Sequence, residues 1–176
     1  MTGDAPRILV IGYGNPGRRD DGLGPALAAA LDGMALPGVT VDADYQLTIE
    51  HAAEIAAHDA VIFADAAVRG PAPFEFRRLD PGEPATFSTH SVSPAGVLAL
   101  AQQCFAARTC GYVLALRGYE FNEFGEGLSP PAQANLAAAV EFLHTVLQDW
   151  RVSEIALPNM GDAFPVAVAA KKGAVV

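Results

Sequence analysis

Two adjacent carboxylates, Asp20 and Asp21, lie in a glycine-rich segment near the start of the chain, residues 12–24 (GYGNPGRRDDGLG). A carboxylate can ligate a metal ion or accept a proton, whereas it repels a phosphate group. Two neighbouring carboxylates cannot both face one site without a raised pKa. We therefore expect one of them to brace the loop and the other to face a functional site.

Two residues further along the chain offer compatible chemistry. Asp65 follows the apolar run 60–64 (AVIFA), and His90 lies in a loop after a stretch rich in Pro and Gly. Asp21, Asp65 and His90 together would present two carboxylates and an imidazole, a donor set that suits zinc or nickel and leaves positions open for substrate or water. Each residue alone has an equally simple structural role, as a cap, a turn residue or a hydrogen-bonded histidine. The hypothesis therefore depends on a fold that brings all three together.

The pattern of apolar runs predicts such a fold. Strands and helices alternate over the first 64 residues, which is typical of a mainly parallel twisted sheet with helices on both faces. We expect a three-layer α/β/α arrangement with about five strands. In such a sheet the carboxyl ends of the strands share one edge, where ligands bind. Asp21 and Asp65 follow the first and third strands, so both should lie at that edge. The predicted strands are 7–11, 39–42, 60–64, 74–79 and 112–116, and the predicted helices are 25–31, 50–57, 93–104 and 129–150.

Glycines shape the turn that carries the two acids. Gly22 and Gly24 allow the backbone to turn sharply and to pass close to a ligand. We assign a loop-shaping or substrate-contacting role to Gly12, Gly14, Asn15, Asp20, Gly22 and Gly24.

Length and charge restrict the function further. The 176 residues are enough for one domain, which we place at residues 1–150, followed by an irregular arm or tail at 151–176. The net charge is −9 and the only lysines are Lys171 and Lys172, so we expect neither nucleic acid nor an anionic membrane as a partner.

The sequence also predicts a location and the state of the thiols. It has no signal-peptide pattern and no long apolar run, from which we expect a cytoplasmic protein. Cys104 and Cys110 lack the spacing of a redox or zinc motif, and we expect both to be buried thiols.

Five short motifs occur in the order and at the approximate spacing of a known family. They resemble the hydrogenase maturation endopeptidases, which trim the C-terminal extension from the large subunit of nickel-iron hydrogenases. The resemblance covers most of residues 7–150. The motifs are Gly12-x-Gly14-Asn15, Asp20-Asp21-Gly22-x-Gly24, Asp65-Ala66, Thr89-His90 and the segment 125–129 (GEGLS).

The resemblance implies a phosphorylase/hydrolase-like α/β fold and an endopeptidase activity. It implies that Asp21, Asp65 and His90 are both the catalytic residues and the ligands of a metal. That metal is the nickel already inserted in the substrate, the precursor of a hydrogenase large subunit, and no organic cofactor is implied. A metal could lower the pKa of the attacking water, or a carboxylate could act as general base, and the sequence leaves both open. For a processing enzyme of this size we expect a monomer.

Three other functions are compatible with parts of the sequence. Gly12-x-Gly14-x-x-Gly17 after a strand matches the dinucleotide-binding fingerprint, but Pro16 lies within the turn and the two acids would repel a pyrophosphate. Residues 14–17 (GNPG) also resemble the start of peptidyl-tRNA hydrolases, whose His-Asn pair is missing here. A chaperone that senses nickel in a hydrogenase subunit without cleaving it would use the same site as the endopeptidase.

Overall fold

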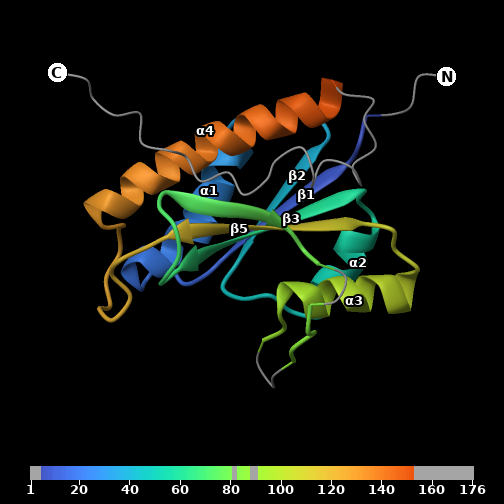
Figure 1. The fold of residues 1–176 in the computed structure, drawn as a ribbon, viewed down its shortest axis with the longest axis horizontal. Helices are drawn as coiled ribbons and strands as arrows, with labels where there is room; N and C mark the ends of the chain where they lie inside the picture. Colours follow the sequence, from blue (N-terminus) through green and yellow to red (C-terminus); the bar gives the residue numbers. More distant parts are fainter. Residues whose placement is uncertain (1–4, 81–82, 88–90, 153–176) are drawn as a thin grey trace.

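A mostly parallel sheet forms the centre of the molecule. The computed structural model describes residues 5–80, 83–87 and 91–152 of the chain. Within these residues, five strands form one sheet in the order β2-β1-β3-β5-β4 (Figure 1). Four strands are parallel, and β4 runs antiparallel to β5 at one edge. The strands are β1 (Ile8–Tyr13), β2 (Val39–Asp44), β3 (Ala60–Ala67), β4 (Phe74–Arg78) and β5 (Cys110–Arg117).

Helices cover both faces of this sheet. In Figure 1, α4 (Pro130–Val152) lies above the strands, and α2 (His51–Ala56) and α3 (Pro94–Phe105) lie below them. The helix α1 (Leu23–Asp32) shares one hydrophobic core with α4 and so covers the same face of the sheet. The predicted three-layer α/β/α fold with a mainly parallel sheet is therefore confirmed. Ser93 caps α3, as its sequence suggests: the Ser93 hydroxyl accepts a hydrogen bond of 3.1 Å from the Gly96 N–H, and Pro94 occupies the first helical position.

The alternation of side chains explains why β1 is apolar throughout. Successive side chains of a strand point to opposite faces, so a strand covered on both sides must be apolar at every position. Ile8 and Val10 pack with α1 and α4, whereas Leu9 and Ile11 pack with α2 and α3, and all four are fully buried. Two hydrophobic cores result, one on each face of the sheet.

The structure corrects two details of the sequence interpretation. The third strand continues beyond residue 64, so Asp65 lies within β3 rather than just after it. The expectation of two buried thiols is wrong, because Cys104 is exposed near the end of α3 and Cys110 is half-buried. Cys104 lies in an apolar stretch of sequence and on the same side of α3 as the buried Val97 and Ala101, but residues 102–106 are all exposed, so this end of the helix is not covered by the core.

The predicted arm after residue 150 is only partly described. Residues 151 and 152 complete α4, and residues 153–176 lie outside the described part of the chain. None of the helices in the described part combines the length and hydrophobicity that a membrane crossing requires.

Candidate functional site

The start of α1 packs directly on the ends of β1 and β3. A Cβ atom at Gly24 would lie 2.3 Å from the Tyr13 carbonyl oxygen and 2.6 Å from the Ala64 carbonyl oxygen. A Cβ atom at Gly12 would lie 2.1 Å from the Gly24 carbonyl oxygen. Only glycine fits at these two positions, because the obstructing atoms belong to the backbone. This close packing brings the turn between β1 and α1 to the carboxyl edge of the sheet.

The turn itself holds Asp21 in place. Gly14 adopts a φ of +138°, which side chains disfavour, and a Cβ atom there would lie 2.1 Å from the Asp21 carbonyl oxygen. The Asn15 N–H donates a hydrogen bond of 3.0 Å to Asp21 Oδ2, and Asn15 Oδ1 accepts one of 2.9 Å from the Gly17 N–H. Gly22 lies against Pro16 across the turn. Of the residues with a predicted loop-shaping role, Gly14 and Asn15 therefore contact Asp21 directly.

Asp20 is the acid that braces the loop. Its side chain is fully buried and accepts four hydrogen bonds of 2.7–2.9 Å, from the N–H groups of Tyr119, Glu120 and Ser129 and from the Ser129 hydroxyl. Burial alone would raise the pKa of Asp20, but the hydrogen bonds from Ser129, Glu120 and Tyr119 outweigh it and lower the pKa. Asp20 thus fastens the glycine turn to the loop between β5 and α4.

Asp65 lies at the same edge of the sheet, in a largely buried position. Burial raises its pKa to about 6, the negative charge of Asp21 adds to the rise, and hydrogen bonds from the Ala66 N–H and from Tyr13 oppose it. The Ala66 N–H lies 2.7 Å from Asp65 Oδ1. Burial and the neighbouring Asp65 also raise the pKa of the Tyr13 hydroxyl, which stays protonated and donates to Asp65. Asp65 can therefore hold a negative charge near neutral pH and still accept a proton.

The structure brings two of the three predicted site residues together. Asp21 and Asp65 are close enough for the charge of one to change the pKa of the other. His90 lies outside the described residues, but the two ends of its loop are placed: Phe87 pairs with Val92, and the Val92 N–H lies 3.4 Å from the Leu47 carbonyl oxygen. Within the described ranges, no three side chains of His, Cys, Asp or Glu are arranged to hold a metal ion.

Tyr13 is a site residue to which the sequence analysis gave no role. Its alternation with Leu9 and Ile11 places it on the face of the sheet covered by α2 and α3, and Asp65 has the same alternation with Phe63. This parity is the signal that could have paired Tyr13 with Asp65.

The glycine turn does not have the geometry of a dinucleotide site. That fingerprint requires a helix that begins at the turn and directs its amino end at a pyrophosphate. Here the short 3-10 helix η1 (Arg19–Gly22) separates Gly17 from the start of α1.

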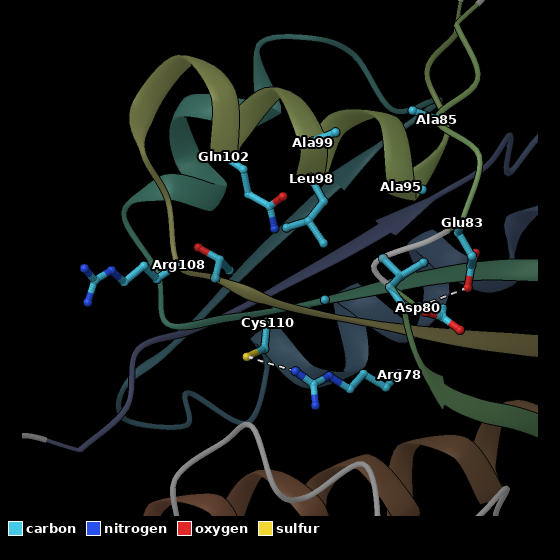
Figure 2. A pocket seen from close by; sticks show the side chains of 13 residues that line it. Arg78, Asp80, Glu83, Ala85, Ala95, Leu98, Ala99, Gln102, Arg108 and Cys110 are labelled. Atoms are coloured by element: carbon cyan, nitrogen blue, oxygen red, sulfur yellow. Dashed lines mark hydrogen bonds between the residues drawn. The ribbon is translucent and has the colours of Figure 1, made fainter.

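Two cavities lie on the face covered by α2 and α3. One, of about 360 Å³, is at the carboxyl edge of the sheet, and Tyr13 is part of its wall. The other, of about 250 Å³, is at the amino end of β5, away from Asp65 (Figure 2). In Figure 2, the Arg78 guanidinium points at Cys110 Sγ, 3.9 Å away, while Arg108 points away from them. None of the predicted site residues lines this second cavity.

Comparison with known proteins gives a consistent set of related structures. A [NiFe] hydrogenase maturation protease, HycI from Thermococcus kodakarensis KOD1, has 24% identity and a TM-score of 0.62, and the match covers 84% of this chain and 95% of that one. The hydrogenase maturating endopeptidase HybD from E. coli has 23% identity and a TM-score of 0.64 over 81% of this chain and 93% of its own. A hydrogenase 2 maturation peptidase from a Thaumarchaeota archaeon has 23% identity and a TM-score of 0.59 over 81% and 98%.

No protein-family model and no curated protein matches the chain. The similarity therefore lies in the three-dimensional arrangement, and it extends over nearly the full length of the solved structures. The chain has the fold of the [NiFe] hydrogenase maturation proteases.

Proposed function

We propose that this protein is an endopeptidase that removes the C-terminal extension from the nickel-loaded large subunit of a nickel-iron hydrogenase. The observation that carries the proposal is the pair Asp21 and Asp65, coupled at the carboxyl edge of a sheet whose fold is that of hydrogenase maturation proteases. The motifs that carry the sequence resemblance support the same activity. We expect a monomer that acts in the cytoplasm on the precursor.

The site residues have two roles in this proposal, which are to bind the nickel and to move a proton. Asp21, Asp65 and His90 coordinate the nickel of the precursor, which brings the peptide bond to be cleaved to the edge of the sheet. Water adds to the carbonyl carbon of that bond, a carboxylate takes the proton of the water, and the C–N bond breaks as the leaving amine takes the proton up.

The experiment that tests this function is a gel-shift assay of C-terminal trimming. The cognate precursor, with and without inserted nickel, is incubated with the wild-type protein, with Asp65→Asn and with His90→Ala. We expect the wild type to shorten only the nickel-loaded precursor and both variants to leave it uncut. Asp32→Asn, an exposed change on α1, and His144→Ala, a change on α4, serve as matched controls and should cleave normally.

Two results would contradict the proposal. Cleavage at the wild-type rate by both Asp65→Asn and His90→Ala would remove the proposed site. A nickel-loaded precursor that binds the wild-type protein but is never shortened would favour the non-proteolytic chaperone.

A further inference from the structure

The cavity of about 360 Å³ lies between two parts of the proposed catalytic site. One wall is Tyr13, whose hydroxyl donates to the carboxylate of Asp65. The opposite wall is the base of the loop that carries His90. A molecule in this cavity is therefore next to the reacting groups, a position unlike that of the cavity in Figure 2.

Hydrogen bonds fix the wall on the side of the loop. The Ser93 N–H donates 3.0 Å to the Thr86 carbonyl oxygen, and the Thr86 N–H donates 3.1 Å to the Ser93 hydroxyl. Phe87 and Val92 pair across the loop as in an antiparallel sheet. The cavity is thus bounded on this side by hydrogen-bonded loop backbone and on the other side by the end of β1.

The lining favours an apolar guest. Leu47 and Val92 are buried beneath the cavity, Pro94 adds a further apolar surface, and Phe87 stands at its rim with 56% of its surface exposed. The remaining lining residues, Gln46, Thr86, Ser91 and Ser93, are polar, and none of the described residues that line the cavity is charged. Burial of a charged group against such a surface is costly without a partner, whereas burial of an apolar group is favourable.

We propose that this cavity binds an apolar side chain of the precursor, from a residue within two positions of the cleaved peptide bond; the inference rests on the proposed function. The distance along the chain follows from geometry. An extended peptide advances about 3.3 Å per residue. The one side chain of Tyr13 both lines the cavity and hydrogen-bonds to Asp65, so we expect a side chain one or two residues from the cleaved bond to reach the cavity. The cavity thereby adds selection by side chain to selection by nickel.

The test compares two exposed phenylalanines of the same chain. Phe87→Ala removes the rim of the cavity, and Phe105→Ala changes a residue of similar exposure, 53%, at the far end of α3. Both variants and the wild type cleave nickel-loaded precursors in which each residue within two positions of the cleaved bond is Leu or Asp in turn. Urea unfolding midpoints establish that both variants are folded.

We expect the wild type to prefer Leu over Asp by tenfold or more at one of these positions, since burial of a large apolar side chain contributes about 1.5–3 kcal/mol. Phe87→Ala should raise KM for the Leu precursor severalfold, with little change in kcat, and should reduce the preference. Phe87→Leu should restore most of it, because it keeps an apolar rim, and Phe105→Ala should behave as the wild type.

The outcomes separate this inference from the function on which it rests. If the wild type cleaves the precursor but shows no preference, or if Phe87→Ala and Phe105→Ala have the same selectivity, the cavity is not the binding site while the endopeptidase stands. If the wild type cleaves no nickel-loaded precursor, the function itself fails and the inference fails with it.

Discussion

Replacement of Asp65 by Asn should stabilise the protein while it abolishes cleavage. The carboxylate of Asp65 is held in a largely buried position beside Asp21, and folding therefore makes its ionised form less favourable. The amide of Asn is neutral and has nearly the same shape. Its oxygen can still accept the hydrogen bond that the Ala66 N–H gives to Asp65.

The size of the effect follows from the pKa of Asp65. It rises from 3.8 to about 6 on folding, and each pH unit corresponds to about 1.4 kcal/mol, which gives about 3 kcal/mol. Between these two pKa values the unfolded chain has lost the proton that the folded protein keeps. The unfolded state then binds fewer protons, so the stability of the wild type falls as the pH rises through this window. The advantage of the variant should be near zero below pH 4 and complete above about pH 6.

Urea unfolding of both proteins at pH values from 4 to 8 measures this difference directly. The midpoint and slope of each transition give the free energy of unfolding, and the difference between the two proteins is compared across pH. Asp32→Asn, an exposed change, controls for the loss of one negative charge. A difference that is the same at pH 4 and pH 8, or a variant less stable than the wild type at pH 8, would refute the reasoning.

Three further predictions follow from the packing of the glycine turn. Asp20→Asn should lower the free energy of unfolding at pH 7 by about 3 kcal/mol, because one of the four donors around the carboxylate loses its acceptor and the negative charge is lost. The difference in stability between wild type and variant should shrink as the pH falls below 4 toward the lowered pKa of Asp20. Ser129→Ala removes only the hydroxyl donor and should cost about 1 kcal/mol in the same urea titration, and an unchanged midpoint would show that this bond contributes nothing. Gly24→Ala should lower the free energy of unfolding by more than about 3 kcal/mol, since the new methyl group meets two backbone oxygens. Gly33→Ala, at the other end of α1, adds a methyl group with only ordinary contacts and should leave the stability unchanged or slightly higher. Equal effects of the two substitutions would contradict the close packing of α1 on the strands.

The fold could be predicted from the sequence because its signals are local. The apolar run of β1 and the Ser93-Pro94 start of α3 each specify their element within a few residues, and the structure confirms both. The alternation of strands and helices then leaves few arrangements other than a parallel sheet between two helical layers.

The site could be predicted only in part, because its details depend on contacts between distant residues. The sequence shows that Asp20 and Asp21 must differ in role, but the choice between them is made by Tyr119 and Ser129, about a hundred residues later. The role of Tyr13 depends likewise on Asp65, a residue of another strand. The burial of Cys104 was misjudged for a similar reason, since an apolar stretch does not say how much of a helix the rest of the fold covers, and residues 102–106 at the end of α3 are exposed.

The hydrogen bonds of Asp20 also affect the order in which parts of the molecule can fold. They join residues 99 to 109 positions apart in the chain, so the glycine turn gains its brace only after the segment around Ser129 has been synthesised and has folded back. Contacts of such long separation form late, since the intervening chain must first lose its conformational freedom. A nascent chain that ends before Ser129 therefore carries Asp21 on an unbraced turn, and the candidate site is completed only after residue 129 has been synthesised.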